Sequence, residues 1–568
     1  MKILLFFIYL LFMGAILFIP DIVVDRFHVA PYLWIGFFMG WLGILLFITF
    51  YGKKIPCPPS SFAVLSVLGI LYVLYHFAFN LVPTIQLLVD CVSFIIAYCF
   101  FSVRGKCRFF YTLLLIIGII VAIIGLSQYW GLFPSFHSSF LVVGPFDNPA
   151  GISALLATLA PFFLFFLNEK KTITLCVTLG FLLVFTVIIL SEARTAIFSV
   201  FVILSCNAYK YFFQKRRLYV CWMTLIGILL LVVLFCFKPD SATGRLLIWR
   251  CCLNLVGIHP FTGGGYGSFR ASYMPEQAAF LVNNPNIVGR QLASNVFHPF
   301  NEYLRILVEQ GWIGFLLFVS ISISIIRYYS KNRTKEKDVA FLSLMIIGIC
   351  AFFSYPLEYP IIRLLAAFLI GLLLSRSMDN TVVKYWRLNK TALILGLVCS
   401  IVLISSISYQ FYKEMQWKKL VEIDTSYQNE KYVDFYQSIY NNTFLHVKPA
   451  FIYSYSVALN EAEMYEKSNA VIHKNLPRLN DYDIQLLQAY NYLKLEKLDS
   501  AQIHFRIASN MIPNRFVPLY ELFKIYKKDE QSGDAKQIAT KIAIMPVKVM
   551  SPKIVFIKRE INNYLSNH

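Results

Sequence analysis

Residues 1–25 read "MKILLFFIYLLFMGAILFIPDIVVD" and carry one basic residue, Lys2, ahead of a long apolar run. The run is longer than the apolar core of a signal peptide, and no A-x-A cleavage site follows it. Its length matches what an α-helix needs to cross the hydrocarbon core of a bilayer. The stretch is therefore expected to be the first membrane span of the chain.

The rest of the chain repeats this pattern. Of its 568 residues, 58% are hydrophobic and only 14% are charged, whereas soluble domains average about 25% charged residues. The apolar residues come in long uncharged blocks, which indicate helical spans, while a β-barrel would show short alternating segments. The fold class is thus predicted to be all-α, a polytopic bundle of transmembrane helices followed by a soluble helical domain.

The apolar blocks predict thirteen spans. They lie near residues 2–20, 32–50, 61–79, 84–102, 108–128, 149–167, 172–190, 194–209, 218–237, 303–326, 339–355, 357–375 and 391–409.

Basic residues predict the orientation of these spans. Lys and Arg accumulate in cytoplasmic loops, and a cytoplasmic N-terminus places nearly every basic loop inside. The formal net charge of +20 is explained by this bias, so no nucleic-acid partner is expected. The inside residues are Lys53, Lys54, Arg104, Lys106, Arg108, Lys170, Lys171, Lys210, Lys215, Arg216, Arg217, Arg327, Lys331, Arg333, Lys335, Lys337, Arg376, Lys384, Arg387 and Lys390.

Two long segments are expected on the outer side. The first is the loop 238–302, and loops of such length usually have a function. The second is the tail, which an odd number of spans places outside, in the periplasm of a cell with two membranes. We therefore predict a membrane domain over 1–410 that includes this loop, and a periplasmic helical domain over 411–568.

The tail has the spacing of helical repeats. Ala489, Ala501, Ala508 and Pro513 follow one another at offsets of 12, 7 and 5 residues, which are small-residue and proline positions of a tetratricopeptide repeat. Ala458 and Ala470 repeat the spacing of 12 upstream. A tetratricopeptide-like domain is predicted, with a generic helical hairpin as the alternative.

The 12 cysteines predict neither disulfides nor a metal site. Most lie in apolar blocks, no C-x-x-C pair occurs, and Cys251 and Cys252 are neighbours. They are interpreted as small apolar residues. No metal and no other cofactor is predicted.

Arginines mark the predicted outer face. Arg194, in "SEARTA", begins a span and is either an interfacial snorkelling residue or an anion ligand, since Arg binds phosphate bidentately. Arg245 is expected in the first turn of a helix that begins near Gly244, capped by Ser241 or Thr243. A cation in that turn opposes the helix dipole, and an external anion would balance it.

Two further features belong to the same loop. Arg250 is five residues beyond Arg245 and is expected on another side of that helix. The run Gly263, Gly264, Gly265 and Gly267 lacks the Lys-Ser/Thr of a P-loop, and Ser268 breaks G-x-G-x-x-G. We therefore interpret the glycines as a tight turn that returns the loop to the membrane.

The stretch 294–318, "SNVFHPFNEYLRILVEQGWIGFLLF", joins the loop to the tenth span. Asn301 suits a helix cap, and Glu302 and Glu309 suit N-terminal turns of a helix. His298 is not needed for a helix start, and neutral His can take a proton from a hydroxyl near pH 7. Elsewhere, Asp147 and Asn148 begin the sixth span and Glu358 lies between two spans, where turn or cap chemistry is the alternative.

In this order, "GPFDNPAGISALL", "SEARTA", "GRLLIWRCCLNLVGIHPFTGGGYGSF" and "HPFNEYLRILVEQGWIGFLLF" resemble the O-antigen ligase and polymerase superfamily over roughly residues 100–375. Its members are bacterial multi-pass, GT-C-like glycosyltransferases of the inner membrane. The resemblance implies metal-independent transfer of a glycan from undecaprenyl diphosphate to an acceptor hydroxyl on the periplasmic face. The acceptor would be the lipid A core of lipopolysaccharide or a similar molecule.

The resemblance also implies residue roles. Family arginines hold the diphosphate, which falls to Arg194 and Arg245, and a family His activates the acceptor, which falls to His298. Arg250, Asn301, Glu302 and Asn148 are the candidate substrate-binding residues. Relatives often read H-x-H-N where this chain has Phe300 in the second His position, so Glu302 is an alternative base.

Several alternatives stay open from the sequence. A polysaccharide polymerase and an O-linked protein oligosaccharyltransferase share the chemistry, and the repeats could bind a protein partner. A lipid-linked-sugar flippase would place charges at the membrane midplane, whereas the polar groups here crowd the outer ends. An assembly scaffold acting through the repeats would leave the arginines unexplained.

Overall fold

The computed structural model describes residues 2–17, 20–77, 81–104, 107–167, 169–212, 217–375, 385–423, 430–547 and 549–567. Five of the basic loop residues named above, Lys106, Lys215, Arg216, Arg376 and Lys384, lie outside these ranges. The chain divides into two compact units. The first holds residues 1–237, 300–303 and 313–418, and the second holds residues 238–299, 304–312 and 419–568.

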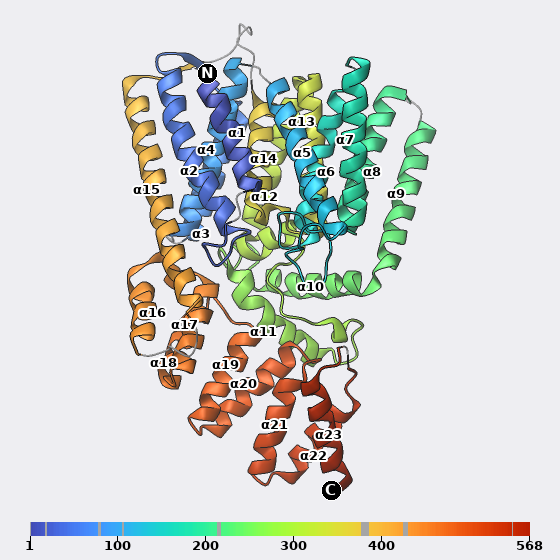
Figure 1. Ribbon diagram of the computed structural model, residues 1–568, viewed down its shortest axis with the longest axis vertical. Helices are drawn as coiled ribbons and strands as arrows, with labels where there is room; N and C mark the ends of the chain where they lie inside the picture. Colours follow the sequence, from blue (N-terminus) through green and yellow to red (C-terminus); the bar gives the residue numbers. More distant parts are fainter. Residues whose placement is uncertain are drawn as a thin grey trace. The chain divides into compact units, whose positions relative to one another are not determined.

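The first unit is a bundle of apolar helices whose successive members run in opposite directions (Figure 1). Each of the thirteen predicted spans coincides with a helix, which confirms the all-α polytopic fold. These helices are α1 (Lys2–Leu17), α2 (Val29–Phe50), α3 (Ser60–Phe77), α4 (Leu81–Arg104), α5 (Cys107–Tyr129), α6 (Pro149–Phe165), α7 (Lys171–Leu190), α8 (Arg194–Phe212), α9 (Arg217–Phe237), α12 (Glu302–Lys331), α13 (Lys335–Phe353), α14 (Pro360–Leu374) and α15 (Lys390–Val421). The helix α12 is kinked at Gly311, and its residues 304–312, like the last three residues of α15, belong to the second unit.

Length and hydropathy qualify seven of these helices as membrane spans by themselves, namely α2, α3, α4, α5, α7, α12 and α15. Others, such as α1, α6 and α14, are equally apolar but shorter. The helix α6 is buried over Gly151–Phe163, and it packs against α5, α7, α8 and α13. A helix covered by protein on every side does not have to match the full bilayer thickness.

The helices α4 and α14 pack closely against each other. A Cβ atom on Gly371 would lie 2.7 Å from the Cβ of Ala97 and 2.8 Å from the backbone nitrogen of Tyr98, so only glycine permits this approach. The same pair is joined by an ion pair of 2.5 Å between Arg363 Nη2 and Asp90 Oδ2. Charges within spans are costly unless they are paired, and here each charge has its partner on the neighbouring helix.

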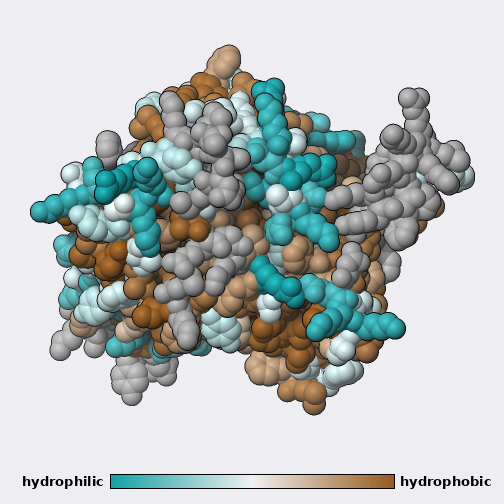
Figure 2. Space-filling view, turned by 90° about the horizontal axis from the view of Figure 1, so that it is seen from above, coloured by the Kyte–Doolittle hydropathy of each residue, from teal (hydrophilic) through white to brown (hydrophobic). Residues whose placement is uncertain are grey.

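Polar loops close the end of this unit at which α1 begins. Figure 2 looks onto that end, where hydrophilic side chains form patches among hydrophobic ones. A two-stranded antiparallel ribbon joins β1 (Lys54–Pro56) to β2 (Tyr385–Arg387). An ion pair of 3.2 Å links Arg108 to Glu169, and another of the same length links Arg333 to Asp338.

The second unit combines the long loop with the tail. The loop forms α10 (Pro239–Ile258), α11 (Ser268–Asn283) and a short 3₁₀ turn, η1 (Arg290–Leu292). The tail forms α16 (Glu430–Asn442), η4 (Phe444–Val447), α17 (Pro449–Glu461), α18 (Tyr465–Asn475), α19 (Tyr482–Lys494), α20 (Leu498–Met511), α21 (Phe516–Lys528), α22 (Ser532–Ile544) and α23 (Pro552–Asn567). The loop 238–299 therefore shares its compact unit with the tail and not with the spans.

The tail is a row of helical hairpins with a regular period. The pairs α17–α18, α19–α20 and α21–α22 pack against each other, and their turns carry Glu463, Glu496 and Glu530 in the left-handed conformation, with φ of 59°, 58° and 56°. These residues are 33 and 34 positions apart, which is the length of a tetratricopeptide repeat. The tetratricopeptide assignment itself stays a prediction.

The register of the repeat differs from the one expected upstream. Ala501 and Ala535 are fully buried where the two helices of a hairpin meet. The residue at the matching position of the first hairpin is Ser468, also fully buried, whose hydroxyl donates to the Ser456 carbonyl at 2.8 Å. Ala470 is exposed. The prediction that Ala458 and Ala470 mark the helix–helix contact of the first hairpin was therefore wrong.

Candidate functional site

Asn148 begins the sixth span as a helix cap. Its Oδ1 accepts a hydrogen bond of 2.8 Å from the Ala150 backbone nitrogen, and Pro149 occupies the first helical position. Asparagine is favoured here because its side chain satisfies a backbone N–H that has no partner within the helix. The cap chemistry expected for this residue is confirmed, while its role as a substrate ligand stays a prediction.

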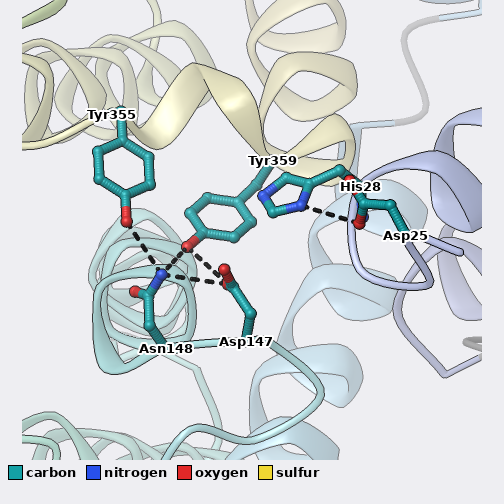
Figure 3. Close-up of polar contacts among 6 residues, drawn as sticks. All are labelled: Asp25, His28, Asp147, Asn148, Tyr355 and Tyr359. Atoms are coloured by element: carbon teal, nitrogen blue, oxygen red, sulfur yellow. Dashed lines mark hydrogen bonds and ion pairs between the residues drawn. The ribbon is translucent and has the colours of Figure 1, made fainter. Parts of the chain in front are cut away.

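The amide nitrogen of the same side chain joins a polar network (Figure 3). Asn148 Nδ2 donates to the hydroxyl of Tyr359 at 2.8 Å and to that of Tyr355 at 3.0 Å. It also lies 3.2 Å from Asp147 Oδ1, which accepts from the Tyr359 hydroxyl at 3.0 Å. The two tyrosines flank η2 (Pro356–Glu358), so this network fastens the start of α6 to the turn before α14.

Tyr359 is the centre of that network. Its side chain is 1% exposed, and burial holds the pKa of its hydroxyl well above the usual value. The hydroxyl therefore stays protonated and donates to Asp147. The ring of His28 stacks on Tyr359 with centroids 5.3 Å apart, and His28 Nδ1 lies 3.2 Å from Asp25 Oδ1 (Figure 3).

These partners were not predicted from the sequence. The stretch "YPLEYP" was noted for Glu358, but the network uses the two tyrosines, each of which precedes a proline. A residue before proline is held in extended backbone conformations. The two Tyr-Pro pairs were therefore the available signal in the sequence. Nothing in the sequence indicated that the two tyrosines pair with Asn148.

The start of α12 is attached to the same turn. Asn301 Oδ1 accepts from the Tyr303 backbone nitrogen at 3.0 Å, which confirms the expected cap. Glu302 is 7% exposed, and its Oε1 accepts from the Leu357 backbone nitrogen at 3.2 Å. Phe300 packs edge-on against Tyr355 at 5.3 Å and has a left-handed backbone with φ of 52°, an uncommon conformation for a bulky residue.

Arg194 is the first residue of α8, as predicted. Its side chain is half-buried, and it follows a turn in which Glu192 has φ of 54°. The helix α8 packs against α6 and α13. Arg194, Asn148, Asn301 and Glu302 thus all belong to the first unit, and each lies at or beside the N-terminus of a helix.

Arg245 and Arg250 lie on α10 in the second unit. The expected start of this helix near Gly244, capped by Ser241 or Thr243, was wrong, because α10 begins at Pro239. Proline suits the first helical position and Asp240 in the first turn complements the helix dipole, so the helix extends further back. Arg245 therefore lies in the second turn.

The two arginines face different surroundings. Five residues of helix separate them by about 140° around the axis; Arg245 is half-buried and Arg250 is exposed. Directly after Arg250, Cys251 and Cys252 are fully buried without a disulfide, and burial raises the pKa of the Cys251 thiol to about 12. These two cysteines are small core residues, as the sequence indicated.

The glycine run forms a turn of close backbone contacts. Gly264 and Gly265 donate backbone hydrogen bonds to the carbonyls of Val308 and Glu309, at 2.9 and 3.0 Å. Gly263 has φ of 72°, and a Cβ there would lie 2.4 Å from the Gln310 nitrogen. The run therefore brings the loop back to residues 304–312 of α12, and its backbone donors are used within the protein.

Glu309 fixes the end of this turn. Its carboxylate is 4% exposed, lies 3.5 Å from Arg305 Nε, and accepts backbone hydrogen bonds from Gly267 and Phe269 at the start of α11. A carboxylate at a helix N-terminus is stabilised by the helix dipole. Glu309 was expected to suit the N-terminal turns of its own helix, α12. Its backbone contacts are instead with the start of α11.

His298 lies in the second unit and is half-buried. Its neighbours are held on both sides. The Arg270 guanidinium lies 4.7 Å from the centre of the Phe297 ring, and Trp249 Nε1 donates to the Pro299 carbonyl at 3.2 Å. Trp249 is one helical turn beyond Arg245, so the helix that carries Arg245 also contacts the segment that carries His298.

Part of the chain is similar to a known protein family. Residues 179–319 match the model of a family described as O-antigen ligase. The matched region contains six of the seven candidate residues, Arg194, Arg245, Arg250, His298, Asn301 and Glu302. The resemblance to the O-antigen ligase superfamily is thereby confirmed over this part of the chain.

Two curated relatives match regions of similar length. A general O-oligosaccharyltransferase of Acinetobacter baylyi is 26% identical over 150 residues, which cover 25% of this chain and 24% of that protein. A putative polysaccharide ligase of Rickettsia felis is 26% identical over 116 residues, which cover 20% of this chain and 27% of that protein. The matched region thus spans about a quarter of the length of each relative.

Proposed function

We propose that this protein transfers a glycan from undecaprenyl diphosphate to an acceptor hydroxyl at the outer face of the bacterial inner membrane. One observation carries the proposal. The region that matches the O-antigen ligase family, residues 179–319, contains both candidate diphosphate ligands and the candidate base. The names of both relatives, an oligosaccharyltransferase and a polysaccharide ligase, agree with a transferase of this class.

In the proposed reaction the acceptor oxygen attacks the anomeric carbon of the lipid-linked glycan. The bond from that carbon to the diphosphate breaks, and undecaprenyl diphosphate leaves with the bonding electrons. Arg194 and Arg245 stabilise the charge that develops on the leaving diphosphate. His298 accepts the acceptor's proton, with Glu302 as the alternative base.

The remaining candidates are assigned to substrate binding. Arg250 is exposed on α10 and is proposed to contact the donor's diphosphate or glycan. Asn148, Asn301 and Glu302 have hydrogen-bond partners within the protein, so we propose that they shape the region that receives the acceptor. The hydrogen bond that Glu302 accepts from Leu357 makes it the weaker candidate base, since a base must be available to the acceptor hydroxyl.

Replacing Arg245 by Ala tests the assignment. Loss of one preorganised donor to a developing charge lowers the rate by about a hundredfold to a thousandfold. The measurement is release of undecaprenyl diphosphate from purified protein given a lipid-linked glycan. Arg559→Ala, which removes an exposed arginine of α23, is the matched control and should keep the wild-type rate.

The same assay separates enzyme from transporter. A flippase moves the lipid-linked glycan without cleaving it, so wild-type protein that releases no undecaprenyl diphosphate would overturn the transferase assignment. Full activity of Arg245→Ala at a normal protein level would refute the role of Arg245.

A second candidate is an O-linked protein oligosaccharyltransferase. The longer of the two matches is to a protein named for that activity, and the helical hairpins of the tail offer a surface of the kind that binds protein. Deleting the gene and profiling lipid A-linked glycan, capsule and glycoproteins together identifies the acceptor. Loss of glycoproteins alone favours this second candidate, and loss of lipid A-linked glycan alone favours the ligase.

A further inference from the structure

We propose that the C-terminal helical hairpins are part of the catalytic apparatus, because Asn514 and Asp483 position the segment that carries His298. The proposal rests on the proposed function. It concerns residues 291–299 of the loop and the hairpin α19–α20 with the turn that follows it, all within the second unit. Asn514 and Asp483 are proposed as positioning residues that act through His298 and do not touch substrate.

The first contact comes from the turn after α20. Asn514 Nδ2 donates to two loop carbonyls, those of Gln291 at 2.6 Å and Ala293 at 3.1 Å. An amide nitrogen has two hydrogens, and both are directed at this one short segment. Ala293 is 3% exposed, so its carbonyl has little access to water.

The second contact joins α11 to α20, which pack along each other. Gln277 is 1% exposed and lies on α11. Its Nε2 donates to the Met511 carbonyl at 2.7 Å and to the Ser294 carbonyl at 3.2 Å, and its Oε1 accepts from the Tyr273 hydroxyl at 2.7 Å. One buried amide thus ties α11, the end of α20 and the His298 segment together.

The third contact lies closest to His298. Asn295 Nδ2 donates to Asp483 Oδ2 at 2.9 Å, in the first turn of α19. Next to it, Val296 is 6% exposed and Phe297 lies against Arg270. From residue 291 to residue 299, six of the nine positions have a described partner in the tail, α11 or α10.

These contacts explain how an irregular segment can hold a catalytic side chain. Residues 293–301 contain no helix or strand, so the segment has no hydrogen-bond ladder of its own to fix His298. Displacement of a reacting group by about 1 Å can reduce the rate by about a hundredfold. The hairpin supplies the missing constraint, and the residues that do so are 185 or more positions away from His298 in sequence.

The test uses isosteric substitution in the full-length protein. Asn514→Asp keeps the shape of the side chain but turns the donor into an acceptor that faces two carbonyl oxygens. We expect kcat for undecaprenyl diphosphate release to fall by roughly tenfold to a hundredfold with KM for the donor unchanged. Asn514→Gln restores a donor and should recover most of kcat, and Asn562→Asp, on an exposed position of α23, should keep the wild-type kcat.

Hydrogen exchange supplies a second readout. In Asn514→Asp, the amides of residues 285–299 should exchange faster while those of α21–α23 keep their protection, which separates loss of positioning from unfolding of the tail. If Asn514→Asp unfolds the tail, Asp483→Asn, which removes the charge that faces Asn295 and Arg515, replaces it in both measurements.

The outcomes distinguish the two proposals. Wild-type kcat and unchanged exchange in both variants, with Arg245→Ala inactive, would overturn the positioning role alone. Full activity of Arg245→Ala would overturn the assigned site whatever Asn514→Asp does. An equal loss of kcat in Asn514→Asp and Asn514→Gln, without recovery, would show that Asn514 acts by a route other than its donated hydrogen bonds.

Discussion

At the scale of single residues, the free-energy cost of burying a hydroxyl depends on its hydrogen-bond partners. Tyr359 serves an amide and a carboxylate at once, accepting from Asn148 and donating to Asp147. Both groups have further partners. Asn148 also caps α6 and contacts Tyr355, and Asp147 lies 3.2 Å from the Asn148 amide nitrogen. The network therefore keeps several of its hydrogen bonds when one of them is lost.

Tyr359→Phe removes that hydroxyl and leaves the ring in place. Two polar groups then lose a partner in a buried setting, which costs about 1–3 kcal/mol of unfolding free energy. We expect a lower thermal unfolding midpoint in detergent. Tyr75→Phe removes a hydroxyl from a side chain that is 75% exposed and should leave the midpoint unchanged; equal midpoints for the two variants would contradict the structural role of the network.

Residue identity predicted the caps but not their partners. Asn148 and Asn301 were recognisable because a cap depends on the next two or three residues of the same helix. The distant contacts of Asn148 with Tyr355 and Tyr359, and that of Glu302 with Leu357, join segments more than 50 residues apart. Local chemistry cannot specify such pairs, nor the stacking of His28 on Tyr359.

At the scale of elements, the local sequence pattern predicted the turn at the glycine run but not the first residue of α10. The run was correctly interpreted as a turn, because four glycines within five residues remove the steric limits on the backbone. The start of α10 was placed five residues too late, since Ser241, Thr243 and Gly244 imitate a helix start. Pro239 and Asp240 together were the stronger signal.

Gly263→Ala tests the glycine turn. The φ of 72° is unfavourable for alanine by about 1–2 kcal/mol, and the added Cβ would meet the Gln310 backbone at 2.4 Å. We expect a lower unfolding midpoint and faster hydrogen exchange over residues 260–270. Gly257→Ala is the matched control within α10, where a Cβ meets nothing within 4 Å and helix propensity favours alanine by about 1 kcal/mol.

A lower midpoint for both glycine variants would indicate that the loop tolerates no added methyl group at all. A midpoint unchanged for Gly263→Ala would contradict the close packing of the turn on residues 304–312.

At the scale of the whole molecule, hydropathy was sufficient for the fold class and the helices. Each predicted span coincides with a helix because long apolar blocks have few alternatives in a bilayer. The grouping of the loop 238–299 with the tail was beyond that reasoning. It depends on individual contacts such as those of Gln277 and Asn514, which hydropathy does not register.

The proposed orientation predicts a labelling pattern. In a variant without native cysteines, Leu132→Cys and Asn562→Cys should react with a membrane-impermeant maleimide added to spheroplasts. Lys331→Cys, at the basic end of α12, should react only after lysis. All three positions are exposed in the structure. The reverse pattern would overturn the orientation, and labelling of Leu132→Cys without Asn562→Cys would contradict a tail on the outer side.

The pairing of loop and tail also sets an order of events during synthesis. Gln277 and its partner Met511 are 234 residues apart, and the ribosome covers that distance in roughly ten to fifty seconds. Four helices, α12 to α15, lie between the loop and the tail. If each crosses the membrane once, the even number of crossings places the tail on the same side as the loop. On the proposed orientation, the loop can make its contacts with the tail only after the tail has reached the same side of the membrane, so the proposed activity is expected only of a chain that contains the tail.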